Sequence, residues 1–167
     1  FSGSGGVTLS GTSNYVLIDK NTFSTSTSKV TVTGNNTVTI SNNSFKSAYV
    51  YAHDNTGLVA LDLNTFTGTP SYTYNSKNWF VVGENLSSGF YFLSSQVTAN
   101  SDNVLYLETS TGVNLMSNTI TGGGVGTEAF HLFEVDGSYI TGNKVSNVSM
   151  GLYMMGDRFN TFSSIDQ

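Results

Sequence analysis

Five acidic residues recur at similar intervals along the chain and are the first candidates for chemistry. They are Asp54, Glu84, Glu108, Glu134 and Asp157. Carboxylates held about 5 Å apart repel one another, so one of them takes a raised pKa or the group recruits a cation such as Ca²⁺. Glycosidases use paired carboxylates at separations of this size. If these acids stack on neighbouring strands, the series predicts acid–base chemistry on a glycosidic bond.

Glu108 and Glu134 are the pair for which we predict a catalytic role, because they lie on neighbouring copies of a sequence repeat. The alternative is that the acids are solvated turn residues, since a shift of one position moves a side chain to the opposite face of a strand. Apart from Ca²⁺, no metal or other cofactor is expected. The chain has no cysteine, and its two histidines, His53 and His131, lie in distant copies of the repeat.

A second candidate site is the stretch TGTPSYTYNSKNW, residues 67–79, which holds the only Pro and the only Trp of the chain. Tyr72 and Tyr74 share a face if this stretch is extended, and Trp79 closes it. Aromatic rings with a polar edge suit contact with sugar rings and their hydroxyls. We therefore predict that Tyr72, Tyr74 and Trp79 bind a saccharide. The alternative is that they cover the flank of the protein or a neighbouring subunit.

The strands that must position these residues are encoded by a repeated sequence motif. Relatives of LDLNTFTG at residues 61–68 are LIDKNTF at 17–23, TISNNSF at 39–45, NLMSNTI at 114–120 and YITGNKV at 139–145. Aligned on the Asn, with Ser95 filling one gap, they recur with the period of roughly 20 to 25 residues that is typical of a solenoid. Asn at such a bend tolerates left-handed backbone geometry and can bond the Asn of the next coil.

Alternation within each copy assigns an inner and an outer face. Apolar residues stand at three places, which in LDLNTFTG and its preceding residues are Val59, Leu61 and Phe66. The residue between the first two is Ala60 here and is variable in the other copies, as expected of an outer face. A further apolar run, such as WFVV at 79–82, precedes each copy and predicts a second strand in every coil.

The repeated Φ-x-x-N-x-Φ pattern resembles the right-handed parallel β-helix repeats of the pectin-lyase-like superfamily, which includes NosD-type repeat proteins and phage tailspikes. The resemblance covers residues 16–145. It implies an all-β, right-handed parallel β-helix of about six to seven coils. It implies no single activity, because the superfamily contains lyases, hydrolases, epimerases, adhesins and inert shafts. No lyase, polygalacturonase or epimerase signature matches residues of this chain.

Charge and hydropathy argue against two kinds of partner, nucleic acid and a membrane-spanning environment. A net charge of −5 with no Lys/Arg cluster argues against nucleic acid, and no apolar run is long enough to span a membrane. Low charge with many hydroxyls and amides favours an extracellular location, and the resemblance implies a cell surface or a virion. The expected partner is a polysaccharide or cell-surface glycan.

Residues 1–167 show no composition break, so we expect a single β-helix domain. No capping helix is visible at either end, and solenoids normally hide their end coils. We therefore expect a fragment that continues into further β-helix coils of a parent chain, or part of an assembly such as a homotrimer. The expected function is that of a structural and glycan-binding surface or fibre domain, as in an adhesin or tailspike. The alternative is a polysaccharide lyase or glycoside hydrolase of the same fold.

Overall fold

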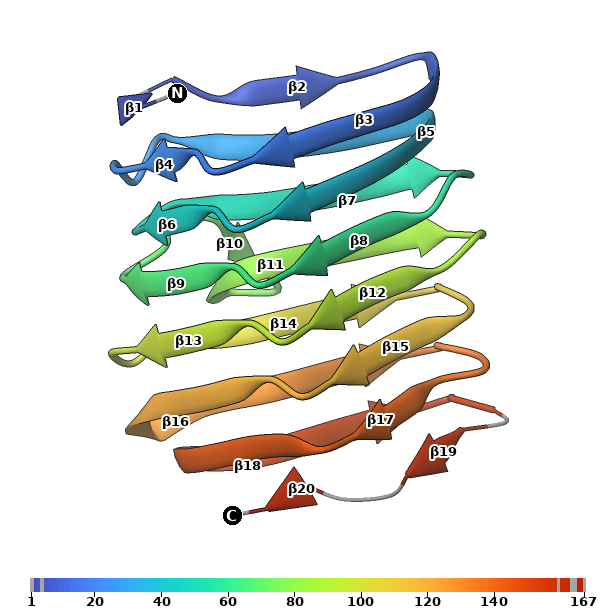
Figure 1. Ribbon diagram of the computed structural model, residues 1–167. Helices are drawn as coiled ribbons and strands as arrows, with labels where there is room; N and C mark the ends of the chain where they lie inside the picture. The colour runs from blue at the N-terminus through green and yellow to red at the C-terminus, as the bar shows by residue number, and fades with distance from the viewer. Residues whose placement is uncertain (1, 4, 159, 163–164, 167) are drawn as a thin grey trace.

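The computed structural model of the protein describes residues 2–3, 5–158, 160–162 and 165–166. Within these residues the regular secondary structure is β-strand, and no helix is present. The strands wind into stacked coils that run from the N-terminal end to the C-terminal end of the molecule (Figure 1). Each coil contributes strands to three faces, and the strands of each face pair in parallel with those of the coils above and below.

The first face carries the candidate site. Its strands are β2 (Val7–Leu9), the first part of β5 (Lys29–Ser41), β7 (Tyr49–Asn55), β11 (Lys77–Leu86), β14 (Asn103–Glu108), the second part of β16 (Thr119–Phe133) and the second part of β18 (Asn143–Met155). We call this side of the solenoid face 1.

Faces 2 and 3 complete each coil. Face 2 consists of β3 (Thr12–Asp19), the second part of β5, β8 (Val59–Asp62), β12 (Phe90–Leu93), β15 (Val113–Met116), β17 (Tyr139–Thr141) and β19 (Thr161–Phe162). Face 3 consists of β1 (Ser2–Gly3), β4 (Thr22–Phe23), β6 (Ser44–Lys46), β9 (Thr65–Gly68), β13 (Gln96–Ala99), the first parts of β16 and β18, and β20 (Ile165–Asp166). The all-β, parallel β-helix prediction is confirmed, with about six turns.

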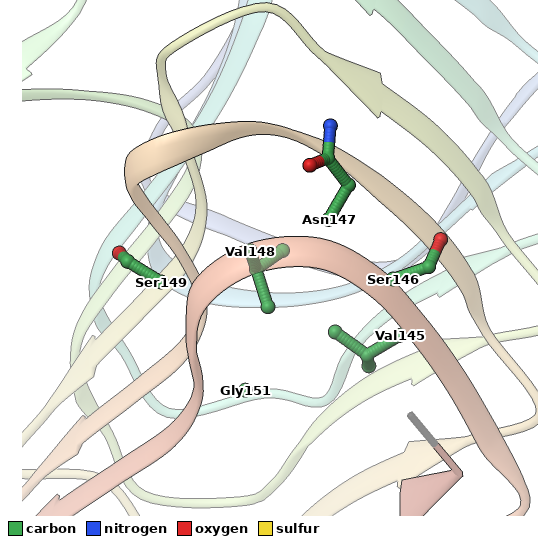
Figure 2. A pocket seen from close by; sticks show the side chains of 6 residues that line it. All are labelled: Val145, Ser146, Asn147, Val148, Ser149 and Gly151. Carbon is green, nitrogen blue, oxygen red and sulfur yellow. The ribbon is translucent and has the colours of Figure 1, made fainter.

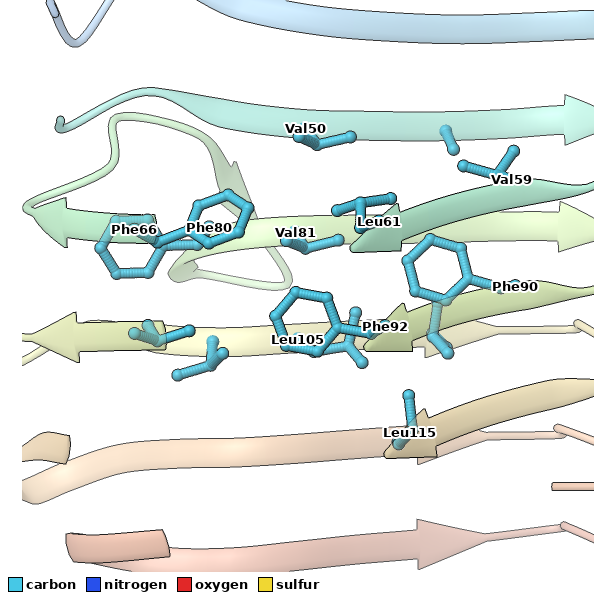
Figure 3. Packing of buried hydrophobic residues seen from close by; sticks show 14 of the residues in the cluster. Val50, Val59, Leu61, Phe66, Phe80, Val81, Phe90, Phe92, Leu105 and Leu115 are labelled. Atoms are coloured by element: carbon cyan, nitrogen blue, oxygen red, sulfur yellow. The ribbon is translucent and has the colours of Figure 1, made fainter. Parts of the chain in front are cut away.

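The apolar core fills the inside of the coils, as the alternation predicts. Val59, Leu61 and Phe66 are fully buried, whereas Ala60 between them is half-buried. On face 3, Phe66 stacks on Phe45 with ring centroids 4.7 Å apart. Figure 3 shows the rings and branched side chains of faces 1 to 3 meeting inside the central coils. Because each side chain packs on its equivalents above and below, the central strands keep register from coil to coil, and the register shifts lie near the corners and in β16 and β18.

A ladder of side chains runs up the corner between faces 2 and 3. The amide nitrogen of Asn43 donates to Oδ1 of Asn64 over 3.0 Å, and Nδ2 of Asn64 donates to the Ile40 carbonyl over 2.8 Å. Ser95 continues the ladder by accepting from the Asn64 amide. From Asn43 onward, each Asn of the ladder thus satisfies both an N–H and a C=O of the coil before it, which a buried bend requires, whereas the Ser95 hydroxyl donates to the Leu93 carbonyl of its own coil.

The left-handed residue at this corner is not the Asn, contrary to the expectation from its conformational tolerance. It is the preceding residue, such as Asn42 (φ 53°), Leu63 (φ 55°) or Ser117 (φ 57°). The Asn keeps its side chain inside the corner, where the ladder needs it. The exposed residue before it takes the unfavourable backbone geometry, at a cost of about 1–3 kcal/mol.

A pocket of about 260 Å³ lies on β18, near the C-terminal end of the stack (Figure 2). Its lining consists of Val145, Ser146, Asn147, Val148, Ser149 and Gly151. Val145 belongs to the apolar core and Val148 packs against it. The pocket therefore continues the core and is separate from the residues predicted to do chemistry.

Candidate functional site

A β-hairpin on the outside of face 1 carries the predicted aromatic residues. Strand β10 (Thr73–Tyr74) pairs antiparallel with the start of β11, so that Tyr74 lies opposite Lys77. The two turn residues, Asn75 and Ser76, have φ values of 48° and 64°. Positive φ at both central positions is the geometry of a two-residue hairpin turn whose twist matches the strands. The enlarged coil of the sequence is thus an excursion that folds back over the solenoid.

The hairpin covers a small second core. Trp79 is 1% exposed, and it packs with Val82 and Tyr106 under Tyr72 and Tyr74. Its indole Nε1 donates to the Tyr74 carbonyl over 3.1 Å. Trp79 therefore does not offer its ring to a saccharide in this conformation. Tyr72 and Tyr74 remain half-buried, and covering the flank of the protein, the alternative raised from the sequence, is what the three residues do here.

The strand register corrects the predicted pairing of acids. Glu108 lies beside Glu84 of β11 and beside Phe133 of β16. Glu134 comes one residue later, at a corner, with φ of 53° and an exposed side chain. The prediction that Glu108 and Glu134 share a row is wrong, because Glu134 belongs to the corner row, in which Asn85 Nδ2 donates to Asp54 over 2.9 Å.

Glu134 lines a different hollow. A pocket of about 450 Å³ at this corner is bounded by Thr109, Glu134, Asp136, Gly156 and Arg158. Spacing alone could not separate the two rows, because some coils place an acid at the last strand position and others place it at the following bend.

Glu108 accepts two tyrosine hydroxyls. Tyr74 donates to its Oε2 over 2.8 Å and Tyr106 donates over 3.1 Å. Burial raises the pKa of Tyr106 to about 12, and the nearby negative charge of Glu108 adds to the effect. Burial and the hydrogen bond to Glu108 also raise the pKa of Tyr74. Both hydroxyls therefore stay protonated and keep the carboxylate of Glu108 in place.

Glu84 is the neighbour of Glu108 in the row. Its Oε1 atom is buried and has no hydrogen-bond partner within the part of the chain that the structure describes. In that same part, no Lys, Arg or His forms an ion pair with Glu84 or Glu108. The two carboxylates would supply only part of the six to eight oxygen ligands of a Ca²⁺ ion. No cluster of three or more His, Asp or Glu able to hold a metal occurs among the described residues.

A second polar group lies under the same end of the hairpin, where Lys77 pairs with Tyr74. Glu128 is 8% exposed, and its two carboxylate oxygens accept from Lys77 Nζ and from His131 Nδ1, the latter over 2.9 Å. Burial works to raise the pKa of Glu128, but the hydrogen bonds from Lys77 and His131 outweigh it, so the pKa lies below its usual 4.5. Reasoning from the sequence missed this group because Lys77 and Glu128 are separated by two coils.

The right-handed beta helix region is the family whose model matches this chain, over residues 1–165. The chain belongs to this right-handed beta helix family. No curated protein and no solved structure matches it. Within the described part of this β-helix, no helix has the length and apolar character needed to cross a membrane. The family determines the fold and leaves the activity to be argued from the site.

Below the hairpin, the β-helix presents two rows of outward side chains on its last coils. One row is Tyr106, His131 and Tyr153, and the other is Glu108, Phe133 and Met155. His131 stacks between the rings of Tyr106 and Tyr153, with centroids 4.9 Å and 4.4 Å away. Among the described residues, no further ring covers the side of Tyr153 away from His131. We call the half-exposed part of these rows, His131, Phe133, Tyr153 and Met155 with Glu108 at its upper edge, the ledge.

The residues of the ledge could have been found from a pattern in the sequence. One outward position of face 1 is occupied in successive coils by Tyr106, His131 and Tyr153. In each strand this position is next in sequence to an inward-facing apolar residue. Aligning the strands of face 1 rather than the Asn motif would have found this column.

Proposed function

We propose that this β-helix is a glycan-binding domain of a cell or virion surface, and that the ledge is its binding surface. The observation that carries the proposal is the position of Glu108: two tyrosine hydroxyls hold its carboxylate beside half-exposed rings. Glycans combine apolar ring faces with hydroxyl donors. A fixed acceptor next to aromatic rings suits both parts of such a ligand.

The ledge suits a linear polysaccharide better than a small buried ligand. Neighbouring coils place equivalent side chains about 4.8 Å apart along the axis. Phe133 and Tyr153 on successive coils therefore offer an extended, shallow surface with Glu108 at one end. The polar, weakly charged surface of the remaining coils supports a structural role alongside binding, as in an adhesin or tailspike. Further coils of a parent chain or a homotrimer would continue the fibre.

Binding to a glycan array, followed by affinity electrophoresis with the glycans that bind, tests this proposal. Replacing Phe133 and Tyr153 together by Ala is expected to weaken binding at least about tenfold, since aromatic contacts contribute about 0.5–1.5 kcal/mol each beyond their area. Glu108→Gln is expected to weaken it as well, because an acceptor becomes partly a donor. Tyr139→Ala, on face 2 and 39% exposed, is the control. Equal binding by all four proteins would exclude the ledge as the binding surface.

A second candidate function is hydrolysis or lysis of a polysaccharide, and one observation favours it. Glu84 and Glu108 lie in register on neighbouring strands. That places their backbones about 4.8 Å apart, near the carboxyl separation of about 5–5.5 Å that retaining glycosidases use. Glu108 is hydrogen-bonded by tyrosines whereas Oε1 of Glu84 is not, so the two carboxyls have the different environments that an acid and a nucleophile need.

Release of reducing ends from polysaccharides tests this second function. Glu84→Gln and Glu108→Gln are each expected to remove activity, whereas Glu134→Gln at the corner is the matched control and is expected to retain it. Loss of activity in Glu134→Gln with retention in Glu84→Gln would contradict the assignment. If the unmodified protein binds a glycan without cleaving it, the hydrolytic or lytic function is excluded and glycan binding is the function that remains.

A further inference from the structure

The tip of the hairpin, residues 73–78, is attached to the solenoid mainly through side chains that end on acids or on a residue bound to one. Tyr74 donates to Glu108, and Asn75 Nδ2 donates to the hydroxyl of Tyr106 over 3.0 Å. Lys77 binds Glu128, and Asn78 Nδ2 contacts Asp102 at 3.4 Å. These contacts reach the two coils that follow the hairpin, so they tie the tip to strands that are distant in sequence.

The base of the hairpin is held differently. Gly68, with φ of +84°, ends strand β9, and Pro70 beyond it is buried. The ring of Tyr72 stacks on Tyr49 at 4.8 Å and lies against Tyr51 at 5.0 Å. None of these base contacts depends on a carboxylate. Losing the acid contacts would therefore loosen the tip, which keeps the bond from Trp79 Nε1 to the Tyr74 carbonyl and the ring contact of Tyr74 with Tyr106, while the base stays in place.

Beneath the tip lie two large rings. Trp79 is 1% exposed and Tyr106 is 4% exposed, and their centroids are 5.3 Å apart. Tyr106 also stacks on His131 of the ledge. Lifting the tip would therefore extend the ledge upward by two rings.

We propose that residues 73–78 form a hinged cover that Glu108 and Glu128 latch, and that loss of the Lys77–Glu128 contact on protonation of Glu128 releases it and exposes Trp79 and Tyr106 as additional ring-binding surface. The inference rests on the proposed glycan-binding function only for the role of the exposed rings. Opening itself needs no ligand. Acidic conditions would thus convert a short ledge into a longer one.

The charged groups around the latch fix the direction of the pH dependence. Glu128 faces Lys77 of β11 and His131 of its own strand, while Met150 of β18 lies beside it in register. Because the pKa of Glu128 is held below 4.5, its contribution is present above that pH and is lost as the pH falls through the folded value.

Glu108 is the second carboxylate that holds the cover. It faces Tyr74 of β10, Tyr106 of its own strand, Glu84 of β11 and Phe133 of β16. Release through Glu128 is expected below about pH 4.5.

Trp79 is the single Trp of the chain, which makes its fluorescence a direct probe of the cover. Acrylamide quenching of Trp79 is measured from pH 7 to pH 3, with far-UV circular dichroism as the check on the fold. Quenching is expected to rise below pH 4.5 while the β-type spectrum persists. Glu128→Gln and Lys77→Met are each expected to raise the opening equilibrium about tenfold at pH 7, the effect of losing one charge-assisted hydrogen bond.

Asp19→Asn is the matched control, because it removes the ion pair with Lys20 at a corner remote from the hairpin. If quenching of Trp79 rises only together with loss of the β-type spectrum, in the unmodified protein and in Lys77→Met, there is no hinged cover. A rise in quenching without stronger retention on the glycans bound at pH 7 would overturn the role given to the rings. Absence of glycan binding at every pH would remove the proposed function and leave the cover to be decided by the quenching data.

Discussion

At the scale of single residues, the side chains of the corner ladder contribute more to stability than their neighbours in sequence. Asn118 accepts the Ser95 amide over 3.0 Å and donates to the Phe92 carbonyl over 2.7 Å, inside a fully buried corner. An Ala at this position would leave both backbone groups without partners. Unsatisfied buried groups cost about 1–3 kcal/mol each.

Asn118→Ala is therefore expected to lower the free energy of unfolding by about 2–6 kcal/mol. Chemical denaturation followed by circular dichroism measures the loss. Asn114→Ala, on the outer side of face 2, is the control and should change stability by less than about 0.5 kcal/mol. Comparable losses at the two positions would mean that the ladder contributes little.

Tyr106 gives a second prediction at this scale. Its pKa is raised from 10.0 to about 12 by burial and by Glu108. A group whose pKa is raised on folding adds stability below its unfolded pKa, and that stability is lost as the pH rises through the folded value. The protein should therefore lose stability between pH 10 and pH 12.

Tyr106→Phe is expected to lose less stability across this alkaline range than the unmodified protein, as measured by thermal unfolding at each pH. Tyr139→Phe, at the exposed outer side of face 2, serves as the control. An alkaline loss that is unchanged in Tyr106→Phe would assign the effect to the half-buried Tyr72 and Tyr74 of the hairpin, whose pKa values burial also raises.

At the scale of strands, the alternation of faces makes a sharp contrast between neighbours. Leu115 is fully buried in β15, whereas Asn114 beside it is half-buried on the outer side. Leu115→Asp is expected to unfold the domain, because an unpaired charge cannot be buried in the core. Asn114→Asp should retain the β-type far-UV spectrum and a cooperative transition. Equal damage from the two substitutions would mean that the faces are assigned wrongly.

The same scale explains what the sequence could predict. The inward columns through Leu61 and Phe66 and the Asn ladder recur at fixed offsets, so they are readable from one chain. The row that contains Glu108 cannot be read from the sequence in this way. The number of residues between the last strand position of face 1 and the Asn differs by one between coils. One residue of slip moved Glu134 from the strand to the bend.

The path of the hairpin is a second feature that could not be predicted from the sequence. Its aromatic content marked residues 67–79 as unusual, but whether a loop points outward or folds back depends on contacts with later coils. The bonds of Tyr74 to Glu108 and of Lys77 to Glu128 decide this, and they join segments 34 and 51 residues apart. No local pattern encodes such contacts.

At the scale of the whole molecule, the central strands of each coil pair only with those of the neighbouring coils, so a complete coil should be removable. Deleting residues 95–117 joins Ser94 to Asn118 and restores the spacing of the motif. This variant is expected to keep a β-type spectrum and cooperative unfolding, with lower stability because one interface is lost. Deleting residues 95–118 removes the ladder Asn as well and shifts Ile120 by one position, which turns it to the wrong face. If the two deletions behave alike, register is not what specifies the fold.

The corner ladder also has a direction. In the rungs formed by Asn it is the later side chain that binds the N–H and the C=O of the earlier coil, as Asn43 does for Asn21 and Ile18, and Asn143 for Asn118 and Leu115. A chain leaving the ribosome is made from its N-terminus, at about 5–20 residues per second. Each coil would therefore wait only a few seconds, the time needed to synthesise roughly twenty more residues, before its successor arrives to close it. Growth of the β-helix would keep pace with translation, with a single unfinished turn exposed at any moment.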